Sequence, residues 1–143
     1  MYTLRLATVD DFDFLYDLHK VSLGEYVQAT WGWDEAFQRN MFTEGFLQPP
    51  VSIIIVDGQP SGSLTIASRP EDEYLAGIEL HPRVQRRGIG ASIVRLVIER
   101  AQARRVPATL RVLKVNVGAR RLYQRLGFVV VGESETHYDM RCG

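Results

Sequence analysis

Cysteine is nearly absent from this sequence of 143 residues, and Cys142 is the only one. A single cysteine cannot form an intrachain disulfide, so the cysteine content gives no indication of an oxidising compartment. Long hydrophobic runs are also missing, and no apolar stretch approaches the length needed to cross a bilayer. No signal peptide is recognised, because Met1 leads directly into a strand-like segment. We therefore expect a cytoplasmic protein that has no membrane partner.

An excess of charge of one sign is missing as well, since 17 basic and 17 acidic residues give a formal net charge of +0. This balance argues against a general surface for nucleic acid or anionic membranes. Lysine is scarce: Lys20 and Lys114 stand beside 15 arginines. Arginine suits forked contacts to phosphate, and three of them crowd one loop at Arg83, Arg86 and Arg87. We interpret the arginines elsewhere as compositional bias.

The length and composition are those of one soluble globular domain. A chain of 143 residues and 16.2 kDa can bury about two-thirds of its unfolded surface in a single core. The hydrophobic fraction of 45% and the charged fraction of 24% are ordinary for such a domain. We therefore expect one domain over residues 1–143.

Hydrophobic periodicity and breaking residues predict the order β-α-α-β-β-β-α-β-α-β-β. Thr8 and Asp11 form a capping-box variant before a first helix that we expect to end near Leu23. In the second helix, Trp33, Phe37 and Met41 share one face and are expected to be core. The predicted strands are 2–6, 51–56, 61–68, 74–80, 110–115, 128–131 and 137–141, and the predicted helices are 9–23, from 34 onward, 91–104 and 117–126.

The connections and faces of these elements are also predicted. Asp57-Gly58 is typical of a two-residue hairpin turn, which Gln59-Pro60 would lengthen, and 69–73 is a polar turn. The helix over 91–104 carries a broad apolar stripe, and the last two strands are expected to form an antiparallel pair. His19 is expected to lie at the boundary of the packing face of the first helix.

The loop Gln85-Arg86-Arg87-Gly88-Ile89-Gly90 separates a strand from a helix. Two glycines one residue apart permit a sharp turn, and consecutive N–H groups at a helix N-terminus suit a phosphate. A Walker loop needs Gly-Lys-Ser/Thr, whereas Gly90 is followed by Ala91 and Ser92. A dinucleotide fingerprint needs a third glycine, and Ile93 occupies that position. The loop taken alone leaves a plain packing turn as an equal alternative.

The loop resembles the Q/R-x-x-G-x-G/A signature that binds acetyl-CoA in the GCN5-related N-acetyltransferases, the GNAT family. The segment from Asn116 to Phe128, NVGARRLYQRLGF, is similar to the second signature of that family, N-x-x-A-x-x-x-Y-x-x-x-G-F. The resemblance is strong from about Tyr74 to the end of the chain and extends to the first half only in element order. It implies an α/β (α+β) fold with a mixed, mostly antiparallel central sheet flanked by about four helices, and acetyl-CoA as co-substrate without a metal.

The resemblance also implies the cofactor contacts. Backbone groups around Glu79 would pair with the pantetheine arm, with an N–H near Leu80 available to the oxyanion, and the loop amides would hold the pyrophosphate. Asn116 resembles a residue that contacts the cofactor, and it is also an expected helix N-cap. The cofactor-binding set is Ile78, Leu80, Gln85, Arg86, Arg87, Gly88, Ile89, Gly90, Ala91 and Asn116.

Transfer of an acetyl group to an amine needs a proton acceptor for the amine and an acid for the sulfur. Tyr123 matches the tyrosine of the family and is the expected acid. Glu79, near the end of the central strand, is the leading base, directly or through water, although it could equally pair with an arginine. His81, His137 and Glu35 remain alternative bases.

The region between the first two helices corresponds to one wall of the acceptor site in the family. Aromatic faces with one carboxylate and one amide would suit a small cationic amine. The expected substrate-binding residues are Tyr26, Trp31, Glu35, Gln38 and His137. Packing of these aromatics against the sheet is an equally weighted alternative.

Three functions follow from these observations. The first is acetyl transfer from acetyl-CoA to a primary amine of a small molecule, by direct attack in a ternary complex. The second is the same chemistry on a protein N-terminus or lysine. The third is a non-catalytic acyl-CoA-binding module, against which Tyr123 argues, because a binder needs no acid. Dimers are frequent in the family, so a homodimer is a further expectation.

Overall fold

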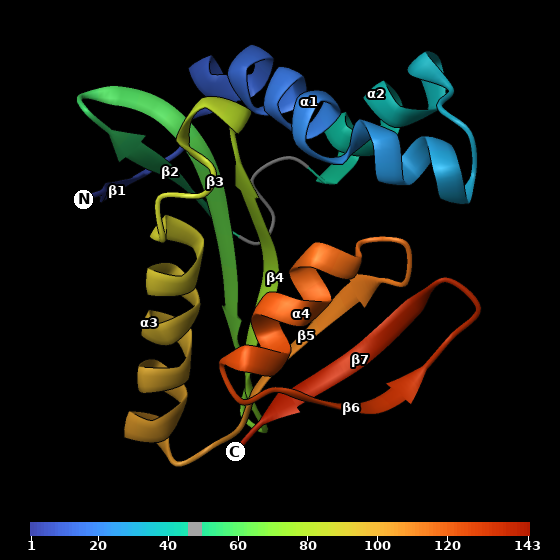
Figure 1. Cartoon of the computed structure of the whole chain (residues 1–143). Helices are drawn as coiled ribbons and strands as arrows, with labels where there is room; N and C mark the ends of the chain where they lie inside the picture. Colours follow the sequence, from blue (N-terminus) through green and yellow to red (C-terminus); the bar gives the residue numbers. More distant parts are fainter. Residues whose placement is uncertain (46–49) are drawn as a thin grey trace. The chain divides into compact units, whose positions relative to one another are not determined.

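The structure is a computed structural model, and it describes residues 1–45 and 50–143 (Figure 1). The helices are α1 (Phe12–Thr30), α2 (Glu35–Gly45), α3 (Ile89–Arg104) and α4 (Val117–Arg125). The strands are β1 (Thr3–Leu6), β2 (Val51–Val56), β3 (Gln59–Ser68), β4 (Glu73–Leu80), β5 (Ala108–Leu113), β6 (Val129–Glu133) and β7 (His137–Cys142). Two short 3-10 turns, η1 (Val9–Asp11) and η2 (Pro82–Val84), precede α1 and α3. The predicted element order is confirmed.

The seven strands follow the hydrogen-bonded order β1-β2-β3-β4-β5-β7-β6. β4 and β5 are parallel, and the β1–β2, β2–β3, β5–β7 and β6–β7 pairs are antiparallel. A parallel pair needs a crossover connection, and helix α3 supplies it. This confirms the mixed, mostly antiparallel sheet that the family resemblance implied.

The chain divides into two compact units. Unit 1 consists of Met1–Thr65 and Gly77–Ile89, and unit 2 consists of Ile66–Ala76 and Gly90–Gly143. Strands β3 and β4 and helix α3 therefore each contribute residues to both units.

In unit 1, helix α1 runs on through Gly24 to Thr30, so the predicted end near Leu23 was wrong. Glycine weakens a helix by only about 1 kcal/mol, and the buried residues on both sides of Gly24 outweigh that cost. Asp11 accepts the Thr8 N–H at 2.8 Å, as the capping box requires. Helix α1 and strand β2 contribute Leu15, Tyr16, Leu18, Val27, Ile53, Ile54 and Val56 to the buried residues of this unit.

Helix α2 contains no buried residue, although its predicted core face was Trp33, Phe37 and Met41. Phe37 is 58% exposed and Met41 is 54% exposed, so that prediction was wrong. The face that contacts α1 carries Phe42, whose ring meets Phe12 at 5.6 Å and Tyr16 at 5.5 Å edge to face. Because α2 carries apolar residues on two faces, its hydrophobic periodicity does not decide which face packs. The face with Phe42 packs on α1, and the face with Phe37 and Met41 is exposed.

Strands β2 and β3 form a hairpin with a two-residue turn at Asp57-Gly58. Both residues have positive φ, 53° and 76°, which is the backbone that a type I′ turn requires. The turn was predicted, but Gln59 and Pro60 already pair with Val56 and Ile55, so they belong to the strand and do not lengthen the loop. A bulge between Ile54 and Ile55 adjusts the register.

Unit 2 contains the predicted apolar stripe of α3, with Ile93, Val94, Val97 and Ala101 at most 2% exposed. The closing antiparallel pair is also confirmed: β6 and β7 form the hairpin drawn in red in Figure 1, and β7 pairs with β5 from Ala108↔Cys142 to Leu113↔His137. Strand β5 contributes Ala108, Leu110 and Val112 to the buried residues.

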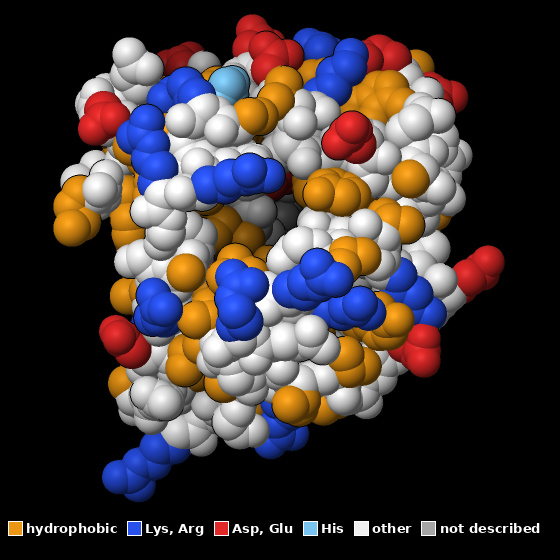
Figure 2. Space-filling model, viewed as in Figure 1, with side chains coloured by type: hydrophobic (Ala, Val, Ile, Leu, Met, Phe, Trp, Pro, Cys, Tyr) orange, Lys and Arg blue, Asp and Glu red, His pale blue; other side chains and the backbone are white. Residues whose placement is uncertain are grey.

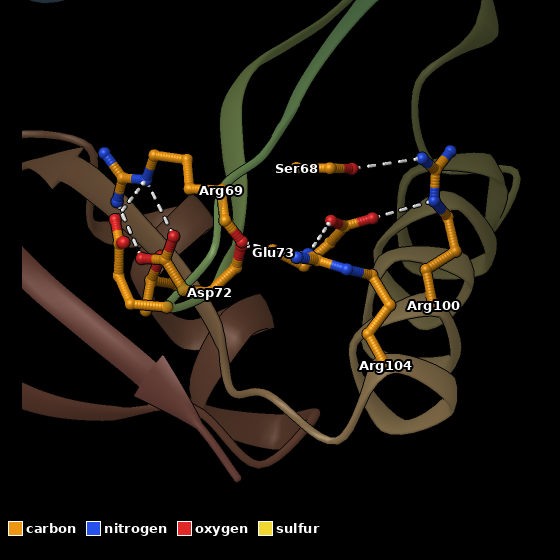
Figure 3. A network of polar contacts seen from close by, with 8 residues as sticks. Ser68, Arg69, Asp72, Glu73, Arg100 and Arg104 are labelled. Carbon is orange, nitrogen blue, oxygen red and sulfur yellow. Dashed lines mark hydrogen bonds and ion pairs between the residues drawn. The ribbon is translucent and has the colours of Figure 1, made fainter.

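A buried ion network joins the start of β4 to the last turns of α3 in unit 2 (Figure 3). The fully buried carboxylate of Glu73 accepts from Arg100 Nε at 2.8 Å and from Arg104 Nη1 at 2.7 Å. Asp72 accepts from Arg69 Nε at 2.7 Å and from Thr109 at 2.6 Å. The sequence predicted a polar turn over 69–73, but Glu73 is the first residue of the strand and its charge is neutralised by helix arginines. These arginines are therefore structural, not merely a compositional bias.

Figure 2 shows one face of the molecule, on which Lys and Arg side chains are prominent and Asp and Glu side chains lie mainly toward the edges. The formal net charge of the whole chain is +0. Within residues 1–45 and 50–143, no helix has the length and apolar character of a membrane span.

Candidate functional site

The turn from η2 into α3 is the loop singled out in the sequence. Its left-handed residues are Arg86 with φ 64° and Gly88 with φ 78°. Gly90 lies inside the first turn of α3. The turn is therefore formed by Arg86 and Gly88, and not by Gly88 and Gly90 as predicted. A Cβ built on Gly88 would meet no heavy atom within 4 Å, so open space lies beside this backbone. Buried Val84 and Ile89 anchor the two ends of the loop.

Two exposed arginines at the loop contact the β2–β3 hairpin of the same unit. Arg87 donates to Asp57 at 3.2 Å, and Arg83 donates to the Pro60 carbonyl at 2.7 Å. Both partners belong to the β2–β3 hairpin, so the arginines hold the loop against the turn of that hairpin. The loop backbone is thereby fixed before any ligand arrives, which limits the entropy lost on binding.

The end of β4 lies just before this loop. The ladder between β4 and β5 joins Glu73, Tyr74 and Leu75 to their partners and, within the described residues, does not extend to Ile78–Leu80. Gln85 Nε2 donates to the Leu80 carbonyl at 2.9 Å, so that oxygen is already satisfied. On the β3 side, a Cβ at Gly62 would clash with the Glu79 carbonyl oxygen, so only glycine lets the two backbones approach.

Two side chains of α1 lie within hydrogen-bond distance of the Glu79 carboxylate. His19 Nδ1 lies 3.1 Å from Oε1, and Ser22 Oγ donates to Oε2 at 3.0 Å. The side chains of His19 and Glu79 are 21% and 15% exposed. The predicted base therefore pairs with a histidine and a serine rather than with an arginine. Each carboxylate oxygen has one further lone pair for another donor.

Burial lowers the pKa of His19, while the hydrogen bond and charge of Glu79 raise it, and a hydrogen bond to Gln38 raises it further. The net effect is a pKa above the usual value of a histidine. The ring also contacts Trp33 at 6.1 Å and Phe42 at 5.6 Å between centroids. His19 is thus a half-buried group that changes charge near neutral pH.

A second cluster in unit 1 surrounds Glu35, at the start of α2. Its carboxylate accepts from Tyr16, from Lys20 at 2.7 Å and from Trp33 Nε1 at 3.2 Å. The bond from Lys20 is the largest cause of a Glu35 pKa of about 2, with Tyr16 and Trp33 acting in the same direction. Glu35 therefore stays ionised and joins α2 to α1, and a substrate ammonium would have to compete with Lys20 for it.

The other expected acceptor residues lie in both units. Tyr26 is half-buried on α1, Gln38 is half-buried on α2, and Trp31, just after α1, is 59% exposed. His137 belongs to unit 2, where its Nδ1 lies 2.8 Å from Thr136 Oγ1. Burial and the nearby Arg111 lower the pKa of His137, against an opposing effect of Asp139.

Tyr123 lies on α4 in unit 2 and is 8% exposed, with its ring edge to face with Phe128 at 5.9 Å. Burial raises its pKa to about 12, so the phenol is protonated at neutral pH. Among the described residues, no hydrogen-bond partner accepts from its hydroxyl. Asn116 caps the same helix, and its Oδ1 accepts the Ala119 N–H at 3.2 Å. The N-cap prediction for Asn116 is confirmed.

Two further expectations concern metals and His81. Within the described ranges, no three His, Cys, Asp or Glu side chains lie close enough together to hold a metal ion. His81 caps η2, and its Nδ1 accepts the Arg83 N–H at 3.2 Å, which occupies one of its two nitrogens.

Sequence reasoning missed His19 and Ser22 as partners of Glu79. It placed His19 at the edge of a packing face, because a single histidine on a helix gives no sign of a partner 60 residues away. The available signal was the spacing: His19 and Ser22 are three residues apart and share one side of a helix.

The comparisons with known proteins agree with this fold. The family model described as Acetyltransferase (GNAT) family matches residues 12–128. PaiA N-acetyltransferase from Thermoplasma acidophilum, solved in complex with coenzyme A, is 14% identical with a TM-score of 0.77, and the match covers 99% of this chain and 98% of that one. No match is found among curated proteins.

Two other solved structures share the fold. The ribosomal-protein-S18-alanine N-acetyltransferase from Escherichia coli is 18% identical with a TM-score of 0.71, covering 99% of this chain and 93% of that chain. Arabidopsis thaliana Naa50, in complex with the bisubstrate analogue CoA-Ac-MVNAL, is 12% identical with a TM-score of 0.72, covering 99% and 98%. With a family model that spans most of its length, the chain belongs to the GNAT family of acetyltransferases.

Proposed function

We propose that this acetyltransferase moves the acetyl group of acetyl-CoA to a primary amine of a small molecule, by direct attack of the amine on the thioester. The observation that carries the proposal is the loop before α3, where the left-handed Arg86 and Gly88 expose backbone beside open space at a helix N-terminus. Such a site favours a diphosphate, because several N–H groups and the helix dipole point toward one concavity.

The residues present fit acetyl-CoA. In the proposed mode, the backbone from Arg86 to Ala91 donates to the diphosphate, and Ile78 and Leu80 pair with the pantetheine arm. The end of β4 lacks a ladder to β5, which leaves its backbone groups available for such pairing. The Leu80 carbonyl is held by Gln85, so the Leu80 N–H is the group that we assign to the oxyanion. Asn116 contributes its side-chain amide, since its Oδ1 is used by the cap.

Tyr123 is the proposed acid for the departing sulfur. With a pKa of about 12 the phenol holds its proton until a strong acceptor forms. Full transfer to a thiolate of ordinary basicity would be uphill by about 5 kcal/mol. Tyr123 therefore stabilises the thiolate chiefly by donating a hydrogen bond, and complete transfer accompanies release of the product.

Glu79 is the proposed base for the acceptor amine. Ser22 donates to its carboxylate, and His19 Nδ1 lies within hydrogen-bond distance of the other oxygen. A free lone pair on each oxygen remains for an ammonium N–H. An amine that arrives protonated must lose one proton before its nitrogen can attack, and a fixed, half-buried carboxylate provides the first acceptor for that proton.

For the acceptor we propose contacts with Tyr26, Trp31, Glu35, Gln38 and His137. Exposed Trp31 offers an aromatic face, and the ionised Glu35 offers a negative charge, as a cationic amine requires. A protein N-terminus is the second candidate acceptor. It is favoured by the shared fold with Naa50, which was solved with a peptide-like bisubstrate analogue.

A panel of small amines and short peptides, assayed for CoA release with acetyl-CoA, tests the proposal. Faster release with a small amine than with peptides supports it, whereas preference for peptides moves the acceptor to a protein N-terminus. Glu35→Gln should raise the KM for the acceptor without changing that for acetyl-CoA. An unchanged acceptor KM would remove Glu35 from the acceptor site.

A further inference from the structure

Glu79 and His19 form a pair that the family signatures do not include, because His19 lies far upstream of both. The pair joins helix α1 to the end of β4 through Nδ1 and Oε1 at 3.1 Å. Ser22, one turn further along α1, occupies the other carboxylate oxygen at 3.0 Å. All three residues belong to unit 1.

Among residues 1–45 and 50–143, the one charged group found to act on His19 is Glu79 on β4. Helix α1 contributes the neutral Ser22, and α2 contributes the neutral Gln38 together with the ring of Phe42. The ring of Trp33, just before α2, covers it further. Lys20, the neighbour of His19 in sequence, is bound to Glu35 instead. The imidazole is therefore coupled electrostatically to a single carboxylate.

A structural hydrogen bond to Glu79 would not need a titratable donor, and Ser22 already provides a neutral one. Imidazole differs from a hydroxyl in that it can accept a proton. In model peptides it holds a proton about 100-fold more tightly than a glutamate carboxylate does. A carboxylate that removes a proton from an ammonium is therefore regenerated faster when an imidazole lies within hydrogen-bond distance of it.

We propose that His19 receives the proton that Glu79 removes from the acceptor ammonium, an inference that rests on the acetyl transfer proposed above. The ammonium N–H bond breaks, its electron pair stays on nitrogen as the nucleophilic lone pair, and the proton moves to Glu79. Protonated Glu79 then donates to Nδ1 of the neutral imidazole, whose Nε2 carries the ring hydrogen, and the proton crosses this bond. After the transfer, the new Nδ1–H donates to the carboxylate. The products are the Glu79 carboxylate and an imidazolium, which then releases one proton to water.

This role makes His19 a residue that acts through Glu79 rather than on the substrate. It also defines the class of acceptor that benefits from it. A strongly basic amine arrives as an ammonium and needs the relay, whereas a weakly basic amine arrives neutral and needs it much less. The structure thus assigns strongly basic primary amines, such as alkylamines, as the acceptor class.

The variants His19→Asn and Ser22→Ala separate the relay from simple anchoring of α1. The asparagine amide retains a donor near the position of Nδ1 but cannot accept a proton at neutral pH. Ser22→Ala removes the other hydrogen bond to Glu79 and leaves the imidazole. The pH dependence of kcat/KM is measured for each protein with one strongly basic and one weakly basic amine, and melting temperatures are recorded in parallel.

We expect His19→Asn to lower kcat/KM for the strongly basic amine about tenfold at neutral pH, a fraction of the usual effect of a general base. The ionisation of His19 should disappear from its pH profile, and the weakly basic amine should react nearly as with the wild type. Added imidazole should partly restore a His19→Ala variant. Ser22→Ala should retain the wild-type shape of the profile.

A wild-type pH profile and wild-type rates for His19→Asn would overturn the relay and leave acetyl transfer intact. An equal loss of kcat/KM in His19→Asn and Ser22→Ala, seen with both amines, would also overturn the relay. His19 would then only hold α1 against Glu79. Failure of the wild type to acetylate any amine is a different result: it would overturn the proposed function, and the relay with it.

Discussion

His19 on α1 and Glu79 on β4 lie 3.1 Å apart, although 60 residues separate them in the sequence. The contact fixes the proposed base in place through a helix that carries none of the family signatures. The backbone carbonyl of Glu79 neighbours Gly62 of β3, whose missing side chain allows the strands to approach. The position of Glu79 therefore depends on two contacts that come from the first half of the chain.

Gly62→Ala should destabilise the protein by about 1–3 kcal/mol, because the new Cβ would overlap the Glu79 carbonyl oxygen and press on Leu80 and Ile54 at 3.0 and 3.1 Å. Gly24→Ala in α1 is the matched control, since a Cβ there meets nothing within 4 Å and alanine favours the helix. Chemical denaturation should therefore show opposite signs for the two substitutions. Equal changes in the free energy of unfolding would show that the close approach of the Glu79 backbone does not restrict position 62 to glycine.

Gly88→Ala should weaken acetyl-CoA binding about tenfold, because the methyl group would occupy the space proposed for the phosphates and the residue would be strained at φ 78°. Gly32→Ala imposes a similar strain, at φ 80°, outside the loop. Isothermal titration with acetyl-CoA measures the affinity of both variants, and only Gly88→Ala should lose affinity if the methyl group obstructs the phosphates. If both variants lost affinity alike, the loop would have no special role.

Tyr123→Phe should lower kcat about 100-fold while acetyl-CoA still raises the melting temperature to the same extent. The phenol is buried, and its hydroxyl has no partner among the described residues, so its removal leaves no broken hydrogen bond in the free protein. Steady-state kinetics and thermal shift on one preparation test this. A variant as active as the wild type would remove Tyr123 from the chemistry.

Glu73→Gln should lower the free energy of unfolding by about 2 kcal/mol, the value typical of hydrogen bonds to a charged group. Burial raises the pKa of Glu73, but the hydrogen bond from Ser68, the charge of Arg100 and the hydrogen bonds from Arg104 and Arg100 outweigh it and hold the pKa below its ordinary value. A carboxyl whose pKa is depressed by folding stabilises the protein above its unfolded pKa, and this stabilisation is lost as the pH falls through the folded pKa.

The wild type should therefore lose stability below about pH 4.5 more steeply than Glu73→Gln does, as followed by denaturation across that range. Glu71→Gln is the control: Glu71 meets Arg69 at 3.5 Å and is 69% exposed, and exposed pairs contribute little. If Glu71→Gln changed the pH dependence as much as Glu73→Gln does, the buried network would not be the cause.

The order of elements, the hairpin turn at Asp57-Gly58 and the two signatures could be predicted from the sequence, because each depends on neighbouring residues. The exposed face of α2 could not, since Phe37 and Phe42 are both apolar and only tertiary contact decides which of them packs. The same holds for Glu73 and for the His19–Glu79 pair. Their partners come from distant elements, and no local spacing brings a carboxylate to a helix that precedes it by tens of residues.

The measurement that tests the account most directly is a crystal structure of the protein with coenzyme A. We expect the diphosphate to accept hydrogen bonds from the backbone of residues 86–91, with the thiol directed toward Tyr123. A diphosphate bound elsewhere, or a protein that binds no coenzyme A at saturating concentration, would contradict the assignment of the loop and of the catalytic residues that depend on it.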